Sequence, residues 1–156
     1  MLQDYIKKIL NAPVYDVAIQ SPLDHAPSLS HRIGAKVWLK REDLQPVFSF
    51  KLRGAYAKMI TLNAAQRERG VIAASAGNHA QGVALAAKKL KIKAVIVMPV
   101  TTPEIKVKAV QSYGAEAVLF GDAYDEAYTH AQQLAKKKKY TYIPSAPETA
   151  GKEVKQ

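Results

Sequence analysis

Short apolar runs alternate with helix-length stretches from residue 70 to residue 143 of the chain. Four runs have the length and composition of strands, at 71–75, 94–99, 115–120 and, more weakly, 140–143. Between them lie amphipathic or alanine-rich stretches that predict helices, near 78–90, 103–112 and 122–138. Near-continuous apolar strands that alternate with helices form a parallel sheet covered on both faces. We therefore expect an α/β fold, a doubly wound parallel sheet of about four strands.

The chain before residue 70 has a different pattern. Its first ten residues place Leu2, Ile6, Ile9 and Leu10 on one helical face, which predicts a surface helix that packs against a core. Residues 11–36 are rich in proline and predict an irregular arm, followed by a strand at 36–42. A helix is predicted to begin near Phe50, with Ser49 as its cap. Pro103 is expected in the first turn of the later helix at 103–112. We divide the chain into an arm at 1–45, an α/β domain at 46–143 and a tail without apolar periodicity at 144–156.

Composition narrows the classes of function. The chain has no cysteine and no apolar run near the roughly 18 residues of a membrane helix. We expect a cytoplasmic protein without a membrane partner. Its net charge of +10 raises the question of nucleic acid, but the lysines are spread along helix faces without interleaved aromatic residues, so we favour a solvated surface. A metal site is not expected, because the spacing does not suit ligation at His25, His31 or His130.

The stretch "VFSFKLRGAYAKM" at 47–59 opens a predicted helix with two cations, Lys51 and Arg53. The helix dipole disfavours each of them there by up to about 1 kcal/mol. A positive helix end, a neighbouring guanidinium and burial all favour the neutral amine, which is the nucleophilic form of lysine. Lys51 is therefore a candidate for a lysine that condenses with a carbonyl compound. The alternative is an ordinary exposed lysine whose neighbour Phe50 belongs to the core.

The stretch "SAGNHAQG" at 75–82 joins a predicted strand to a predicted helix. Ligands of open α/β sheets bind at the carboxyl ends of strands, and free N–H groups at a helix start hold carboxylates or phosphates. The alternative is a simple capped turn, although His79 and Gln81 are not needed for a cap. A hydrolase triad with Ser75 is not expected, because a third member is missing. Further upstream, the charges at 41–43 suit either a buried ion-pair network or a solvated turn, and we prefer the turn.

Three stretches taken together closely resemble the threonine dehydratases, which are pyridoxal-phosphate enzymes of the tryptophan-synthase-β type. They read "KREDLQPVFSFKLRGAYAKM", "ASAGNHAQGVALAA" and "AVIVMPVTTPEIKVKAVQSYGAEAVL". The opening "APVYDVAIQSPL" is similar to the biosynthetic form, which makes 2-oxobutanoate for isoleucine. The similarity extends over about residues 1–143. It implies the small domain of a fold-type II pyridoxal-phosphate enzyme, preceded by an arm and strand of an incomplete large domain at 1–45.

The resemblance also implies roles for single residues. Lys51 would bond covalently to the aldehyde of pyridoxal 5′-phosphate, with Phe50 beside the ring and Asn78 hydrogen-bonded to the phenolic oxygen. Ala76 stands where serine racemases of this type carry a second serine, which favours dehydration of L-threonine or L-serine. The loop that holds the substrate carboxylate would consist of Ser75, Gly77, Asn78 and His79.

The resemblance ends near residue 143. In this family a glycine-rich loop for the cofactor phosphate and a partner for the pyridine nitrogen lie in the second half of the sequence, whereas this chain continues with "TAGKEVKQ". We therefore expect an amino-terminal part of the enzyme that binds the cofactor weakly, and that associates with itself or with a complementing subunit. The alternative is an inactive small-domain fragment that serves as a basic binding module or has no function.

Overall fold

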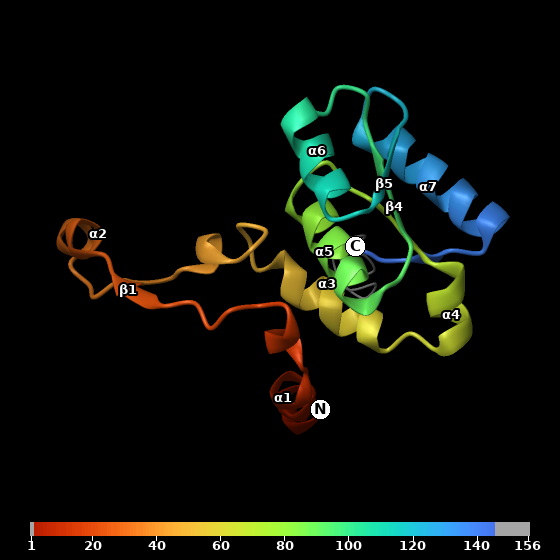
Figure 1. Ribbon diagram of the computed structural model, residues 1–156. Helices are drawn as coiled ribbons and strands as arrows, with labels where there is room; N and C mark the ends of the chain where they lie inside the picture. The colour runs from red at the N-terminus through yellow and green to blue at the C-terminus, as the bar shows by residue number, and fades with distance from the viewer. Residues whose placement is uncertain (1, 146–156) are drawn as a thin grey trace, which may run out of the picture.

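A four-stranded parallel sheet forms the centre of the protein in a computed structural model that describes residues 2–145 (Figure 1). Its strand order is β5-β4-β3-β6. The strands are β3 (Val71–Ala74), β4 (Ala94–Met98), β5 (Glu116–Leu119) and β6 (Thr141–Tyr142). Every residue of β3 and β4 is buried, because these inner strands have neighbours on both edges and helices on both faces. The α/β fold with a parallel four-stranded sheet is thus confirmed, with each strand one or two residues shorter than predicted.

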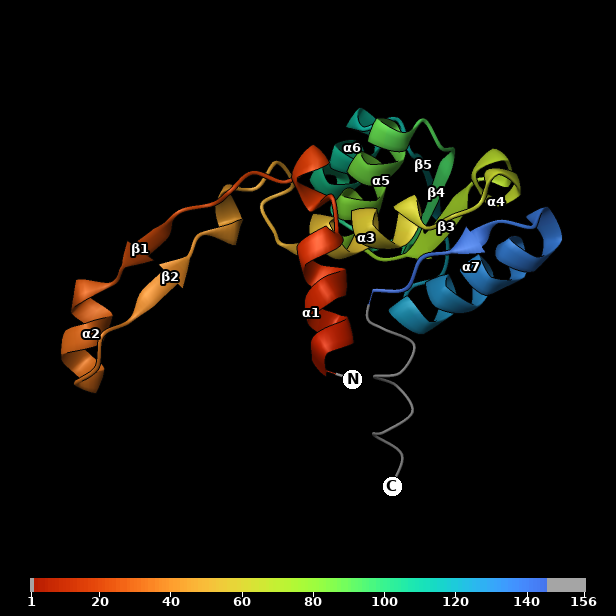
Figure 2. The ribbon, with the colours of Figure 1, turned by 90° about the horizontal axis from the view of Figure 1, so that it is seen from below.

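Helices cover both faces of the sheet (Figures 1 and 2). Side chains alternate along a strand, so Ala73 and Ile96 face one helical layer while Ile72 and Val97 face α7. The first layer consists of α3 (Lys51–Ile60), α5 (Asn78–Leu90) and α6 (Glu104–Ser112). The opposite face is covered by α7 (Tyr124–Lys138), through the buried side chains of Ala127, Ala131 and Ala135. The predicted starts of α6 and α7 were too early by one and two residues, and Pro103 is the N-cap residue of α6.

The chain reverses its direction of travel across the sheet once. It runs outward from β3 to β4 and β5 through α5 and α6, and then α7 returns it along the other face to β6, beside β3. Such a reversal opens a crevice at the carboxyl ends of the two strands between which it occurs, where ligands of open α/β sheets bind. Within residues 2–145 these two strands are β3 and β6, so we expect the crevice at their carboxyl ends.

The amino-terminal region corrects the sequence prediction. Residues 11–36 are not irregular throughout, since they contain β1 (Leu23–His25) and α2 (Pro27–Ile33). The strand predicted at 36–42 shortens to β2 (Trp38–Lys40), which pairs antiparallel with β1. This hairpin projects from the body, as Figure 2 shows. Helix α4 (Ala64–Arg69) was also not predicted, because its six residues are too short for a clear apolar period.

Helix α1 (Leu2–Asn11) forms as predicted, but its apolar face does not pack against the described core. Among residues 2–145, nothing covers Ile9 and Leu10, which are exposed by 72% and 77%. The division of the chain at residues 45 and 143 stays a prediction, and most of the predicted tail lies outside the described residues.

A polar cluster fastens the arm to the first turn of α3. The carboxylate of Glu42 accepts two hydrogen bonds from Arg53, at 2.8 and 3.0 Å, and a third from Ser21. Gln45 is fully buried and pairs with both backbone groups of Ile19, accepting from its N–H at 2.9 Å and donating to its carbonyl at 2.8 Å. The guanidinium group lowers the pKa of Glu42 to about 2, so this carboxylate stays charged at neutral pH.

The preference for a solvated turn at 41–43 was therefore wrong for Glu42. Its side chain is only 17% exposed, and that of its partner Arg53 is 23% exposed. The preference was right for Arg41, which pairs with Asp24 and Asp43 at the surface. Sequence could not separate the two neighbours, because Glu42 reaches a partner 11 positions away that only the fold brings near.

The junction between α4 and β3 depends on glycine. Gly70 has a φ of +94°, and a Cβ there would lie 2.8 Å from the carbonyl oxygen of Lys93, which is fixed by the N–H of Val71. We expect Gly70→Ala to lower the unfolding free energy by about 2–4 kcal/mol, from backbone strain and overpacking together. Gly114→Ala is the matched control, since Gly114 has a φ of +84° with nothing within 4 Å, and should lose only about 1 kcal/mol. Equal losses in urea denaturation would show that the clash contributes nothing.

Candidate functional site

The candidate site lies at the carboxyl ends of β3 and β6. After β3, the N–H of Ser75 still donates to the carbonyl of Val97 at 3.1 Å, which extends the ladder by one residue. The chain then turns, and the Ser75 hydroxyl accepts the N–H of Gly77 at 3.2 Å. Helix α5 begins at Asn78, so a three-residue turn converts the innermost strand into a helix that starts at the crevice.

The start of α5 is built to receive an anion. Gly77 is its N-cap residue and provides no side-chain cap, so the N–H groups of the first turn point outward with the positive end of the helix dipole. Nothing lies within 4 Å of the position that a Cβ of Gly77 would occupy. The glycine is not required by a positive φ, since its φ is −131°. It instead leaves open space over the turn, where a carboxylate can approach the backbone.

Lys51 reaches this crevice from the first turn of α3. Its Nζ donates to the carbonyl oxygen of Ser145, just beyond β6, at 3.1 Å, and lies 5.6 Å from the ring centroid of Phe50. The helix begins at Lys51 rather than at Phe50, and its cap residue Phe50 has no capping side chain. The predicted role of Ser49 holds in another form, because its hydroxyl accepts the N–H of Lys51 at 3.2 Å.

His79 lies in the first turn of α5 and is only 6% exposed. Its Nε2 is 3.0 Å from the carbonyl oxygen of Ile143, and because a carbonyl can only accept, Nε2 carries the proton. Burial lowers the pKa of His79, the hydrogen bond to Ile143 opposes this, and the positive charge of Lys51 lowers the pKa further. The imidazole is thus held neutral and ties α5 to the end of β6.

Of the predicted site residues, the structure brings Lys51 and His79 to the same short segment, 143–145. Ser75 and Gly77 form the turn beside it, while Asn78 and the ring of Phe50 are exposed at its mouth. No observation here assigns a ligand to any of them, so their roles stay predictions.

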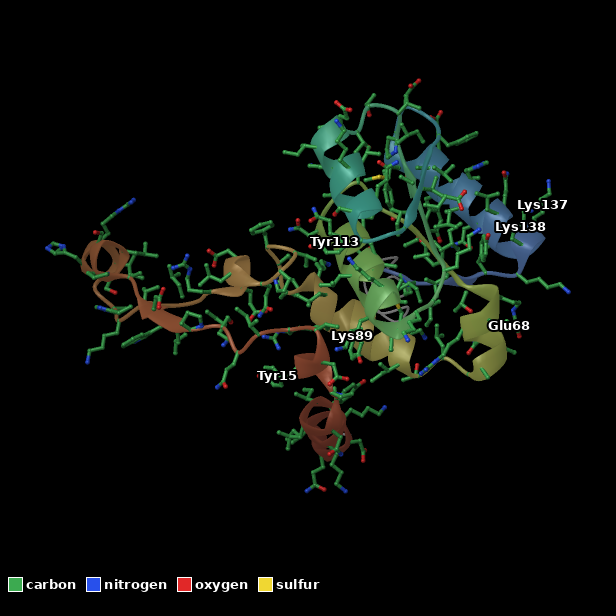
Figure 3. The ribbon with its side chains drawn as sticks, viewed as in Figure 1. Tyr15, Glu68, Lys89, Tyr113, Lys137 and Lys138 are labelled. Atoms are coloured by element: carbon green, nitrogen blue, oxygen red, sulfur yellow. The ribbon has the colours of Figure 1, made fainter. Side chains whose placement is uncertain are left out.

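Arg53, the second cation at the start of α3, has partners of its own. Its guanidinium group forms the ion pair with Glu42 and stands 5.3 Å from the ring of Tyr15, which is labelled in Figure 3. The carboxylate compensates its charge, so the two cations at the start of α3 serve different partners. The sequence analysis also did not single out Gly82, which lies against the backbone of residues 51 and 52. The signal that could have identified it is a glycine inside an otherwise alanine-rich helix.

Several basic residues of the described part of the chain lie at helix ends and on helix surfaces. Figure 3 shows Lys137 and Lys138 at the end of α7, and Lys89 on α5. Cations at a helix end complement the exposed carbonyl groups there, which explains the lysine run locally. The distribution thus favours neither a nucleic-acid groove nor the alternative of a basic binding module.

An aromatic aldehyde with an amino-acid substrate requires an amine, an aromatic face, an amide donor and free N–H groups for a carboxylate. The described residues offer an amine at Lys51, an exposed ring at Phe50, an amide at Asn78 and an uncapped helix start after Gly77. The described residues are therefore compatible with pyridoxal phosphate at Lys51, and the roles of Phe50 beside its ring and of Asn78 as a donor to its oxygen stay predictions.

The sequence pattern of the pyridoxal-phosphate dependent enzymes matches residues 14–154, and the chain belongs to that family. This membership confirms the predicted cofactor. Over 141 residues the chain is 61% identical to a biosynthetic threonine dehydratase of Arabidopsis thaliana chloroplasts, covering 90% of this chain and 24% of that protein. It is 57% identical to a biosynthetic L-threonine dehydratase of Pasteurella multocida, with 90% and 28% covered. The resemblance stated from the sequence is thereby confirmed.

Solved structures agree. The processed form of threonine deaminase isoform 2 from Solanum lycopersicum superposes with a TM-score of 0.88 at 56% identity, over 92% of this chain and 42% of that one. Maize serine racemase superposes with a TM-score of 0.84 at 30% identity, over 90% and 43% of the two chains. The chain thus spans about a quarter of the first of the curated relatives and corresponds to the amino-terminal part of the enzyme.

Location is not decided by these comparisons. Similar threonine dehydratases come from chloroplasts of Arabidopsis thaliana and from mitochondria of Saccharomyces cerevisiae. No helix between residues 2 and 145 is long and apolar enough to cross a membrane. The cytoplasmic location stays a prediction.

The buried neutral imidazole predicts a pH dependence of stability. Because the folded-state pKa of His79 lies below its unfolded value of about 6.5, its contribution is present above about pH 6.5 and is lost as the pH falls through the folded-state pKa. In that window we expect the unfolding free energy of the wild type to fall by up to about 1.4 kcal/mol per pH unit more than that of His79→Gln. The glutamine keeps a donor for the carbonyl group of Ile143 but cannot take up a proton. Urea denaturation between about pH 7 and about pH 5 measures this. His31→Gln controls for removing one imidazole, and parallel slopes in wild type and His79→Gln would contradict the assignment.

Proposed function

We propose that this chain carries the lysine-bearing part of a threonine ammonia-lyase site, which converts L-threonine, or L-serine, to the 2-oxo acid and ammonia. The single observation that supports it most is that Lys51 Nζ and the buried His79 converge on segment 143–145, at the switch point of the sheet. From L-threonine the product is 2-oxobutanoate, a precursor for isoleucine. A cytoplasmic setting, and assembly with itself or with a complementing subunit, belong to the same proposal.

The substrate is positioned by the turn at the start of α5. Its carboxylate binds over Gly77, where the backbone is open, and accepts from N–H groups of the first helical turn. His79 holds that turn against β6 and, being neutral, leaves the charge of the carboxylate to the helix dipole. The side chain of Asn78 supplies a further donor at the mouth.

Lys51 performs the proton transfers. Pyridoxal phosphate, when bound, supplies the electron sink that makes the α-proton of the substrate removable. The Lys51 amine takes that proton, and the resulting ammonium group donates it to the β-hydroxyl group, which departs as water and leaves the amine neutral again. The side chain of Ala76 packs against the core and provides no acid on the other face, which favours elimination over racemisation. Hydrolysis of the dehydrated product releases ammonia and 2-oxobutanoate.

Covalent trapping tests the role of Lys51. We expect pyridoxal phosphate followed by borohydride to label Lys51 at least about tenfold faster than the exposed Lys137, because only the first has a positioned carbonyl site. Peptide mass spectrometry measures both lysines in one molecule, and Lys51→Ala should lose the fast label. Ammonia release from L-threonine that disappears in Lys51→Ala would extend the result to the reaction. Labelling that follows solvent exposure alone would exclude the proposal.

A methyl group on the turn tests the carboxylate site. Gly77→Ala introduces no clash within the chain and no positive φ, so we expect its unfolding free energy to stay within about 1 kcal/mol of wild type. The methyl group occupies the space of the carboxylate, so the apparent Kd for L-threonine should rise about tenfold or more. Amide NMR shifts of residues 77–79 during titration measure the affinity. Unchanged affinity would place the carboxylate elsewhere.

A further inference from the structure

Gly82 lies inside α5 at the point where the first turn of α3 crosses it. A Cβ on Gly82 would lie 3.1 Å from both the Cα and the N of Leu52, and 3.2 Å from the carbonyl carbon of Lys51. These distances are shorter than ordinary van der Waals contact between carbon atoms. All three neighbours are backbone atoms, which cannot rotate away as a side chain does. The two helices lie side by side in both views (Figures 1 and 2).

Glycine is otherwise a poor choice at this position. It is among the least favourable residues in a helix interior, and the other small buried positions of α5 are alanines: Ala80, Ala84, Ala86 and Ala87. The φ of Gly82 does not lie in the left-handed region, so backbone conformation does not require it. What distinguishes position 82 is its contact with the backbone of residues 51 and 52.

The start of α3 is held from two sides. Leu52 is fully buried in a cluster with Val47 and Ala18, which presses the first turn of α3 towards α5. On the α5 side, the missing Cβ of Gly82 lets the backbone come close. Gly82 follows Asn78 by one helical turn, so both lie on the same face of α5. The depth of this contact therefore sets how far the Lys51 side chain reaches along that face towards segment 143–145.

We propose that Gly82 is a positioning residue for Lys51, which sets the separation of α3 and α5 at which Nζ meets the carbonyl group of its partner. The inference rests on the proposed function of Lys51. A methyl group at position 82 would push the first turn of α3 away by roughly half an ångström, which is the tolerance of a catalytic constellation. Misplacement on this scale slows a positioned reaction by about tenfold or more.

The test compares Gly82→Ala with Gly54→Ala. Both replace a glycine inside a helix, but a Cβ at Gly54 has nothing within 4 Å, so this control adds the same methyl group without the contact. The full chain is labelled with pyridoxal phosphate and borohydride, and the rate at Lys51 is divided by the rate at Lys137 of the same molecule. Thermal melting and the double variant Gly54→Ala with Gly82→Ala complete the set.

We expect Gly54→Ala to keep the wild-type ratio within about twofold and Gly82→Ala to lower it about tenfold or more, at temperatures where both are folded. An unchanged ratio in folded Gly82→Ala would overturn the inference. The inference would also be overturned if Gly82→Ala could not fold even in the double variant with Gly54→Ala. Gly82 would then be required for folding, and no separate effect on the position of Lys51 would exist. A wild-type ratio near one would instead reject the proposed function of Lys51.

Discussion

The site depends on one close contact between backbones, the crossing of the first turn of α3 over Gly82 of α5. Lys51 projects from that turn, and its Nζ ends at the carbonyl group of Ser145. Because α5 starts where β3 ends, the same contact relates the lysine to the turn at 75–77. A hydrogen bond from His79 to Ile143 then fixes the turn to the neighbouring strand. Within residues 2–145, two helices and two strands thus meet where the direction of the chain across the sheet reverses.

Charge fixes the other side of α3. The dipole at the start of this helix disfavours Arg53, yet the carboxylate of Glu42 offsets that effect through two hydrogen bonds in a mostly buried pair. An exposed pair such as Arg41 with Asp43 contributes little to stability, because water screens it. Removing the partner of Glu42 should lower the unfolding free energy more, because it would leave the charge of a mostly buried side chain unpaired. The ion pair and Gln45 therefore hold the arm, while Leu52 and Gly82 hold the helix.

Much of the fold was readable from local pattern. The buried strands β3 and β4 appear in the sequence as continuous apolar runs. Helix α5 has a clear start after Gly77 and an alanine-rich face, so its bounds at 78–90 were predicted correctly. Elements of three to six residues, such as β1, β2 and α4, were missed or overextended because they are shorter than the period that identifies them. The partner of Glu42 was not readable at all, since a sequence does not order its long-range ion pairs.

The sequence by itself determined the fold class, the candidate lysine and the candidate turn, because hydrophobic periodicity and residue chemistry are local properties of the chain. Only the tertiary structure decided that segment 143–145 joins Lys51 to His79, that Arg53 belongs to Glu42, and that Gly82 sets the approach of two helices. Each of these relations links positions distant along the chain. They depend on distances of a few ångströms, which packing alone establishes.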